Sequence, residues 1–349
     1  MSADRTLQRV WYERAPFVLF LLLIPLSWLF AAIAGLRRAA YRAGWLRAVR
    51  IERPVLVVGN VSVGGTGKTP LVIWIADYLA SRGCKVGIVT RGYGGRSETW
   101  PRDVSRESSA EEVGDEAVLL AARTNAVVVA GPDRVAAAQR AARSADVILS
   151  DDGLQHYRLA RDAEIVVLDA ERAFGNGWLL PAGPLREPRA RIKDAALVVQ
   201  SIRGREHPPL LERSIGAIHA LGDAINLRTG ERRPLHSFGG QVHAVAGIGH
   251  PEAFFAMLKH CGLKIDAHAL PDHAALEIED ITFHDAAPVL MTEKDAVKCR
   301  AFANDLHWAV PLTVRFSEAD ERMLTGVLDR LAAPAADISA DSRSRGGRP

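Results

Sequence analysis

The sequence predicts a doubly wound α/β fold, built on a mainly parallel sheet and joined to a second, smaller α/β domain. Short apolar runs alternate with segments long enough to be helices, which is typical of parallel strands linked by crossovers. The runs predicted as strands of the main sheet are residues 55–58, 86–90, 127–130, 147–150, 165–169 and 197–200. Residues 70–81 and 133–143 are predicted to be crossover helices, so both faces of this sheet should be covered.

The length and the second series of apolar runs predict two domains. A chain of 349 residues can bury two cores without disulfides or metal ions to stabilise them. A polar stretch at 226–237 precedes further apolar runs at 242–248, 289–292 and 312–316, so we place the main domain at 51–235 and the smaller one at 236–331. Residues 332–349 are rich in Ala, Ser, Arg and Pro without apolar periodicity, which predicts a disordered tail.

The first 50 residues are predicted to anchor the chain to a membrane. No charged residue occurs from Ala15 to Leu36, and a helix of this length would extend about 33 Å, enough to cross a bilayer. More arginines follow this stretch than precede it, which predicts that the carboxy-terminal side stays in the cytoplasm. The helix either spans the bilayer or lies in one leaflet, and a signal peptide or a buried core helix is the alternative.

Charge and cysteine usage exclude some classes of protein. The net charge is +3 in a nearly balanced set of acids and bases, so we expect no nucleic-acid partner. Cys84, Cys261 and Cys299 lie far apart without CxxC spacing, which argues against a disulfide framework and against a structural zinc site. A reducing compartment fits this pattern.

A glycine-rich loop follows the first predicted strand and precedes a predicted helix. Its residues are Ser62, Val63, Gly64, Gly65, Thr66, Gly67, Lys68 and Thr69. In such loops backbone N–H groups bind phosphates, the lysine contacts the β- and γ-phosphates, and the Ser or Thr hydroxyl binds Mg²⁺. Ser62 stands where the usual pattern has glycine, but the order of strand, loop and helix favours a nucleotide site over a chance turn. The main domain is therefore predicted to be P-loop NTPase-like, with ATP and Mg²⁺ as cofactors.

Acidic residues follow the apolar runs where a metal ion would be needed. Asp151 and Asp152 end the run at 147–150, and one of them should contact Mg²⁺ as a Walker-B-type acid; a solvated turn is the alternative. Gln155 and His156 follow closely enough to reach a substrate. Asp115 precedes the apolar run at 117–122, so its carboxylate either points into the crevice or only caps a helix.

Three further segments carry polar side chains that allow two interpretations each. Arg91 lies in a glycine-rich loop after residues 86–90, where a simple turn is equally compatible. Arg186 and Glu187 stand between two prolines and either bind phosphate and Mg²⁺ or form a surface ion pair. His273 belongs to the second domain and matters only if that domain closes over the first.

Several motifs together resemble those of one enzyme family. The motifs are Gly59-Asn60 with the phosphate loop, Arg91-Gly92-Tyr93-Gly94, Gly114-Asp115-Glu116, Asp151-Asp152-Gly153-Leu154-Gln155-His156, Pro184-Leu185-Arg186-Glu187-Pro188 and Thr292-Glu293-Lys294-Asp295. They extend over nearly the whole chain, which resembles the tetraacyldisaccharide 4'-kinases of lipid A synthesis. Leu154 replaces an aromatic residue that often occurs in this family, a difference that concerns local packing rather than catalysis.

The resemblance implies an activity and a role for each residue. The γ-phosphate of ATP would be transferred to the 4'-hydroxyl of an acylated glucosamine disaccharide 1-phosphate, giving the 1,4'-bisphosphate at the cytoplasmic face of the inner membrane, in contact with membrane lipids. Asp115 is implied as the base, His273 as its charge partner, and Lys68 as the cation that stabilises the transferred charge. The implied magnesium contacts are Thr69, Asp152 and Glu187. The residues implied to position phosphate or sugar are Asn60, Arg91, Asp151, Gln155, His156 and Arg186.

The main alternative is a membrane-bound P-loop ATPase or nucleotide switch. The segment Thr292-Glu293-Lys294-Asp295 follows an apolar run and hints at guanine recognition. However, Glu293 separates the threonine from the lysine, so the spacing of a guanine-reading loop is not met. The kinase interpretation is therefore favoured over the switch.

Overall fold

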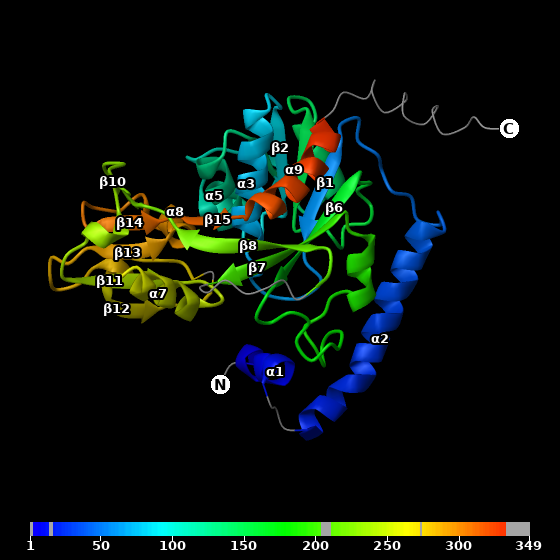
Figure 1. Ribbon diagram of the computed structural model, residues 1–349, viewed down its shortest axis with the longest axis horizontal. Helices are drawn as coiled ribbons and strands as arrows, with labels where there is room; N and C mark the ends of the chain where they lie inside the picture. Colours follow the sequence, from blue (N-terminus) through cyan, green and yellow to red (C-terminus); the bar gives the residue numbers. More distant parts are fainter. Residues whose placement is uncertain (1–2, 14–16, 204–210, 273, 333–349) are drawn as a thin grey trace.

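The computed structural model describes residues 3–13, 17–203, 211–272 and 274–332, which form two sheets with helices packed against them (Figure 1). The larger sheet has nine strands and the smaller has six. The predicted disordered tail and His273 lie outside the described residues, apart from Ala332 at the end of the last helix. The mixed α/β architecture agrees with the predicted fold class.

The nine-stranded sheet carries the phosphate loop. In spatial order its strands are β15 (Leu312–Arg315), β8 (Ser214–Leu221), β7 (Leu197–Arg203), β6 (Ala163–Asp169), β1 (Val55–Gly59), β5 (Val147–Asp151), β2 (Val86–Thr90), β4 (Val127–Ala130) and β3 (Arg102–Val104). The strands from β8 to β4 are parallel, whereas the two edge strands β15 and β3 are antiparallel to their neighbours. All six strands predicted for the main sheet are confirmed, with ends that differ by up to three residues.

Both faces of this sheet are covered, because its central strands are apolar on both sides. Along β1, Leu56 and Val58 belong to one core and Val55 and Val57 to the other. The first core is closed by α3 (Lys68–Ser81), α5 (Asp115–Arg123) and α9 (Glu318–Ala332), and the second by α6 (Arg134–Ala141). The short helix α4 (Ala110–Val113) precedes α5. The two predicted crossover helices correspond to α3 and α6.

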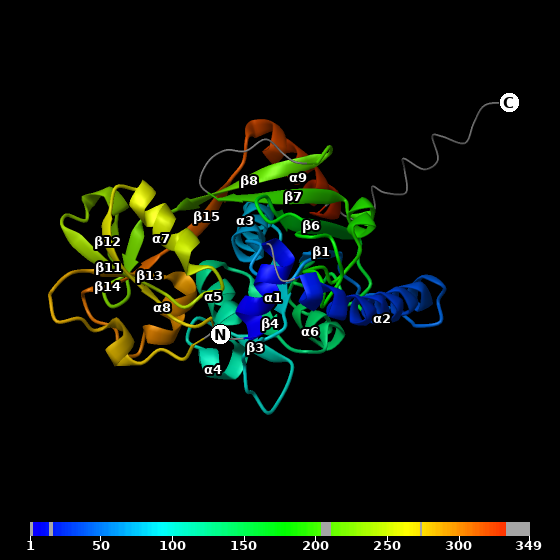
Figure 2. The same cartoon turned by 90° about the horizontal axis from the view of Figure 1, so that it is seen from below.

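The six-stranded sheet forms a separate unit (Figure 2). Its spatial order is β10 (Arg232–Arg233), β9 (Ala224–Asn226), β14 (His307–Val310), β13 (Val289–Thr292), β11 (Gln241–Ala246) and β12 (Lys264–Ala269). Helix α7 (Pro251–His260) packs on one face, and α8 (Glu293–Cys299) packs on the other. The 3-10 helices η2 (Leu235–Ser237) and η3 (Ile278–Ile281) belong to this unit, whereas η1 (Arg189–Asp194) lies between β6 and β7 of the larger one. Strand β12 is the edge strand beyond β11.

The smaller unit is inserted into the larger one, which differs from the predicted boundaries at 235 and 331. The chain leaves after β8 at Leu221 and returns at β15, which pairs with β8 in the nine-stranded sheet. At the crossing, the Gly222 N–H donates a hydrogen bond to the Pro311 carbonyl at 2.8 Å. The run at 312–316 was predicted for the second domain because it follows that domain in sequence, and local pattern does not reveal a long-range antiparallel partner.

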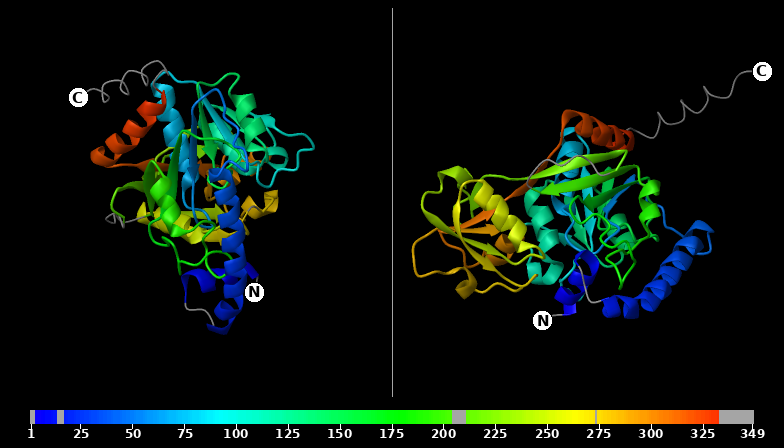
Figure 3. Two further views of the ribbon diagram at one scale, coloured as in Figure 1. Left: turned by 90° about the vertical axis from the view of Figure 1, so that its right-hand side faces the viewer. Right: turned by 60° about the horizontal axis from the view of Figure 1, so that its bottom comes forward.

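The amino-terminal helices are α1 (Ala3–Tyr12) and α2 (Phe17–Arg42), and α2 runs along the side of the larger unit (Figure 3). By length and composition, residues 18–42 could cross a membrane. In the structure, one face of α2 contacts the larger unit. The Ser27 hydroxyl donates to the Leu179 carbonyl at 2.8 Å, and Phe20 contacts Trp178 edge to face. The rest of the apolar surface is exposed, including Leu22 at 68 % and Leu29 at 58 %.

Candidate functional site

The phosphate loop joins β1 to α3, as its sequence predicts. Gly67 adopts a left-handed conformation with φ of 76° just before α3 begins at Lys68. A Cβ atom at Gly67 would lie 2.4 Å from the His219 ring, so glycine is required for both conformation and space. A Cβ atom at Gly64 or Gly65 would meet nothing within 4 Å. The outer side of the loop is therefore open to a ligand, while its inner side is packed against the sheet.

A layer of polar side chains from β6, β7 and β8 supports the loop from below. The Ser201 hydroxyl lies 3.0 Å from His219 Nε2, and both side chains are buried beneath Gly67. Arg203 donates from Nη2 to the Gly65 carbonyl at 2.6 Å, and its Nη1 lies 3.1 Å from Asp169 Oδ2. None of these residues was predicted, because they follow apolar runs without a recognisable motif.

Lys68 is held in an ion-pair cluster at the ends of β1 and β5. Its Nζ lies 3.3 Å from Asp152 Oδ1, and Arg186 Nη1 lies 3.3 Å from the other carboxylate oxygen of Asp152. Asp152 has a φ of 51°, in the left-handed region that few residues other than glycine adopt. Two cations and one acid from three distant segments therefore meet beside the phosphate loop.

Asp151 and Asp152 are neighbours in sequence, but their pKa values are shifted in opposite directions. Burial, with a smaller contribution from the charge of Glu116, raises the pKa of Asp151 to about 7. Burial also acts on Asp152, but the charges of Lys68 and Arg186 outweigh it and lower the pKa of Asp152. Asp152 is thus the carboxylate held in its charged form near neutral pH, a difference between the two neighbours that the residue pattern alone did not reveal.

The proline-bounded segment 184–188 lies directly against the phosphate loop. The Val63 N–H donates to the Pro184 carbonyl at 2.8 Å, and the Arg186 N–H donates to the Val61 carbonyl at 2.7 Å. Ser62, which is buried, pairs with Leu185 in the same ladder. This pairing brings Arg186 to Asp152 and excludes the isolated surface ion pair that was the alternative for Arg186 and Glu187.

Glu187 points to a different neighbour. Both of its carboxylate oxygens accept from the Tyr157 hydroxyl, at 2.6 and 2.8 Å. Burial, followed by the hydrogen bond to Glu187, raises the pKa of Tyr157 to about 12. Glu187 is therefore buried beside the loop with a hydrogen-bonded tyrosine, a partner that sequence reasoning missed.

Asn60, Gln155, His156 and Arg91 gather around the same edge of the sheet. Gln155 donates from Nε2 to the Asn60 carbonyl at 3.0 Å. Burial lowers the pKa of His156 to about 4, and the charges of Arg134 and Arg91 add to this effect. His156 is therefore neutral at physiological pH. Arg134, a buried cation at the start of α6, was not predicted; its Nη1 donates to the Gly131 carbonyl at 2.7 Å.

Asp115 begins α5 and faces the inserted unit. Its side chain is buried, and its Oδ1 accepts from the Glu116 N–H at 2.8 Å. Lys298 Nζ from α8 lies 3.8 Å from Asp115 Oδ2, and Lys294 Nζ lies 4.0 Å from the same oxygen. Lys298 also donates to the Ala274 carbonyl at 3.1 Å. The inserted unit thus places two cations at Asp115.

The segment Thr292-Glu293-Lys294-Asp295 lies in the inserted unit and contacts the larger one, and it does not resemble a base-reading loop. Buried Asp295 accepts from the Thr292 hydroxyl at 2.6 Å and from the Gly247 N–H at 2.9 Å, which fixes the start of α8. Glu293 reaches back to Arg123 at 2.5 Å, and Lys294 reaches Glu116 at 3.1 Å. In the sequence this motif supported the family resemblance and argued against guanine recognition, but it did not predict these contacts.

The residues around the loop fit a phosphate ligand and a metal ion. Within the described residues, buried Thr66 Oγ1, Asp151 Oδ1 and both side-chain polar atoms of Asn60 have no hydrogen-bond partner. Buried polar atoms in proteins are normally paired, so such a cluster indicates partners supplied by a ligand. Thr69 follows Lys68 on the first turn of α3, and the Lys68 ammonium lies at Asp152. A threonine hydroxyl and a carboxylate are oxygen ligands of the kind that Mg²⁺ prefers.

The supporting layer predicts a dependence of stability on pH. Burial, more than the charge of Arg203, lowers the pKa of His219 to about 4. Below a pH of about 6.5 the unfolded chain binds a proton that the folded chain refuses, so the free energy of unfolding falls as pH falls towards about 4. Between about pH 7.5 and pH 5, the wild type should lose roughly 2 kcal/mol more than His219→Gln. Urea denaturation of both proteins at both pH values measures this difference, and equal losses would contradict it.

Comparisons with known proteins identify the family of the chain. The family model described as tetraacyldisaccharide-1-P 4'-kinase matches residues 19–331. A tetraacyldisaccharide 4'-kinase of Alkalilimnicola ehrlichii is 49 % identical over 323 residues, covering 92 % of this chain and 96 % of the relative. A second, of Nitrosococcus oceani, is 45 % identical over 335 residues, covering 95 % and 96 %. The crystal structure of LpxK from Aquifex aeolicus in complex with ATP has a TM-score of 0.77 and 31 % identity, covering 90 % of this chain and all of that one. The chain therefore belongs to the tetraacyldisaccharide-1-P 4'-kinase family.

Proposed function

We propose that this protein transfers the γ-phosphate of ATP to the 4'-hydroxyl of tetraacyldisaccharide 1-phosphate, giving the 1,4'-bisphosphate and ADP. The observation that carries this proposal is the cluster of Lys68, Asp152 and Arg186 on an open phosphate loop. Family membership supplies the substrate class, since the curated relatives are named for this reaction. A nucleotide switch is not favoured by any contact of the Thr292–Asp295 segment.

Mg²⁺ would be held by Thr69 and Asp152, with Glu187 as a further ligand. The low pKa of Asp152 keeps its carboxylate charged, and a carboxylate such as Glu187 retains lone pairs beyond those used by Tyr157. Bound Mg²⁺ would neutralise charge on the β- and γ-phosphates. Asp151, with its raised pKa, suits a hydrogen-bonding role next to this set better than direct ligation.

Lys68 and Arg186 would stabilise the charge of the transferred group. Each contacts a different carboxylate oxygen of Asp152, so this acid holds two cations beside the phosphate loop. Phosphoryl transfer depends mainly on such positioning and on charge stabilisation. Asn60, Arg91, Gln155 and His156 complete the rim, and we assign them to positioning phosphate or sugar.

Asp115 would act as the base. As the 4'-oxygen bonds to the γ-phosphorus, its proton passes to Asp115, while the bond from the phosphorus to the β–γ bridging oxygen breaks and ADP leaves with that electron pair. Lys294 and Lys298 lie at the Asp115 carboxylate and stabilise its charged form before the proton arrives. We retain His273 as a charge partner, because its described neighbour Ala274 shares Lys298 with Asp115.

We also propose that α2 lies along the cytoplasmic face of the inner membrane rather than across it. Contacts with the larger unit occur near both ends and in the middle of the helix, at Phe20, Ser27 and Arg42. A helix fixed along its length to a domain in water cannot place its middle at the bilayer centre. Its exposed stripe of apolar side chains suits burial in one leaflet, where the acylated substrate also resides.

Replacing Lys68 tests the proposed reaction. Lys68→Met keeps the apolar stem but removes the charge, so phosphorylation should fall by about 100-fold or more. Mass spectrometry of a reaction with ATP, Mg²⁺ and the disaccharide lipid measures the added phosphate and its position. Lys85→Met is the matched control, because Lys85 is exposed at the opposite end of the strands. Lipid phosphorylation that survives in Lys68→Met would refute the proposal, as would ATP hydrolysis without a phosphorylated lipid.

Replacing Asp115 tests its role as the base. Asp115→Asn should lower kcat by about 100-fold or more while ATP affinity stays unchanged, because the base contacts the acceptor and not the nucleotide. Single-turnover kinetics and equilibrium nucleotide binding separate the two effects. Glu111→Gln, an exposed acid on the neighbouring α4, serves as the control. A kcat within about threefold of the wild type would remove Asp115 from the mechanism.

The orientation of α2 predicts which side chains bind lipid. Leu22→Glu with Leu29→Glu should abolish most sedimentation with vesicles containing anionic lipid, because two exposed apolar side chains would carry charge into the leaflet. Ile278→Glu introduces a charge at another exposed apolar residue, 49 % exposed in the inserted unit, and should leave sedimentation unchanged. Equal binding by both variants would show that this stripe does not face the membrane.

A further inference from the structure

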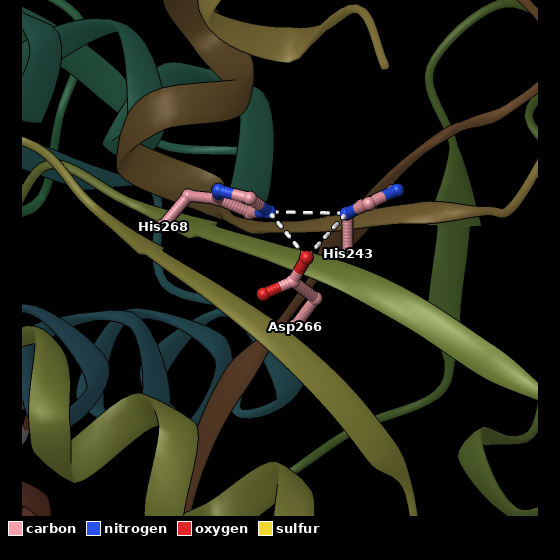
Figure 4. Close-up of side chains that lie close together, drawn as sticks. All are labelled: His243, Asp266 and His268. Atoms are coloured by element: carbon pink, nitrogen blue, oxygen red, sulfur yellow. Dashed lines mark hydrogen bonds and ion pairs between the residues drawn. The ribbon is translucent and has the colours of Figure 1, made fainter. Parts of the chain in front are cut away.

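Two histidines and an aspartate meet on strands of the inserted unit (Figure 4). His243 lies on β11, and Asp266 and His268 lie on the edge strand β12. The parallel register places His243 opposite Asp266, and His268 follows two residues later on the same face of the strand. The three side chains point towards one another, although their positions span 26 residues of sequence.

The distances among the three ligand atoms match one face of a tetrahedron. His243 Nδ1 lies 3.0 Å from His268 Nε2, and Asp266 Oδ2 lies 3.7 Å from each of these nitrogens. Zinc bonds of about 2.0–2.1 Å in tetrahedral geometry place neighbouring ligand atoms about 3.3 Å apart. Small adjustments of exposed Asp266 and half-buried His268 would therefore bring all three atoms to one ion.

A second carboxylate fixes the orientation of the most buried ligand. His243 Nε2 lies 2.9 Å from Asp285 Oδ1, so the ring proton on Nε2 is donated there and Nδ1 presents its lone pair to the cluster. Phe283 stacks on the His243 ring, with ring centroids 3.7 Å apart, and also contacts His268. A hydrogen-bonded carboxylate and an apolar neighbour are the usual surroundings of a metal-binding histidine.

We propose that His243, Asp266 and His268 bind a divalent transition-metal ion of the zinc class. Two imidazoles and one carboxylate favour Zn²⁺ over Mg²⁺, which prefers an all-oxygen shell. Three protein ligands leave a fourth position on the exposed side of the cluster, which a water molecule fills. The ion would join edge strand β12 to β11 and, through Asp285, to the segment that follows η3. The spacing of cysteines argued against a structural zinc site, but these ligands are not cysteines.

The test is Zn²⁺ binding to the full, untagged chain in excess Mg²⁺. Metal-free protein is titrated with Zn²⁺ in competition with a chromophoric chelator. The wild type should bind one ion that His268→Ala and Asp266→Asn bind at least tenfold more weakly. Asp285→Asn should weaken binding by about 10–100-fold through the orientation of His243. His236→Ala, an exposed histidine outside the cluster, should bind as the wild type does.

Two further readouts guard against misfolded variants and adventitious binding. Zn²⁺ should raise the melting temperature of the wild type and of His236→Ala but not of His268→Ala, whose metal-free melting temperature checks its fold. Substituted Co²⁺ should give the visible absorption of a four-coordinate ion only in proteins with the intact cluster. The proposal is overturned if His268→Ala and His236→Ala bind Zn²⁺ equally, since the cluster would then be only a hydrogen-bonded pair of histidines.

Discussion

The position of β1 between β5 and β6, with all three strands parallel, is the constraint on which the site depends. In this register Val58 lies beside Asp151, so the phosphate loop and the acidic pair leave the sheet at the same edge. Apolar side chains on both faces of β1 require cover on both sides of the sheet, which the helices of the two cores supply. The order of the buried strands therefore determines which polar residues lie next to the phosphate loop.

At this edge two aspartates each lie close to two cations that come from other parts of the chain. Asp152 is shared by Lys68 and Arg186, and Asp115 is approached by two lysines of the inserted unit. Lys68 lowers the pKa of both neighbouring aspartates, but burial and the charge of Glu116 outweigh this effect at Asp151, whereas Arg186 adds to it at Asp152. Burial alone would raise the pKa of both, so the nearby cations decide which acid is charged.

Much of the site could be predicted from sequence because its chemistry is local. The phosphate loop and the pair Asp151 and Asp152 each follow an apolar run, and both the strand and the polar end are visible within about ten residues. The layer of Ser201, His219 and Arg203 could not be predicted, since its members meet the loop only through the order of strands. Likewise, β15 returns to the first sheet because of its pairing with β8, which no local pattern encodes.

The sequence also did not predict side chains that lie on one element and contact another element far away in the chain. Lys294 and Lys298 look like ordinary charges on a short helix, yet they lie at the Asp115 carboxylate of the other unit. The cluster on β11 and β12 had no signal either, because its histidines are 25 residues apart and neither spacing nor neighbours mark them. Contacts between elements distant in sequence account for what was missed.

The two crossings between the units lie side by side, joined by the hydrogen bond from Gly222 to Pro311. A single covalent link would let the inserted unit rotate freely about its axis, whereas two adjacent links resist torsion and allow bending. If the inserted unit moves, α8 can then approach α5 or move away from it only by bending about these two links. The cations it carries would arrive at α5 in a fixed orientation each time, so the assembly of the two halves is guided by the path of the chain as much as by charge.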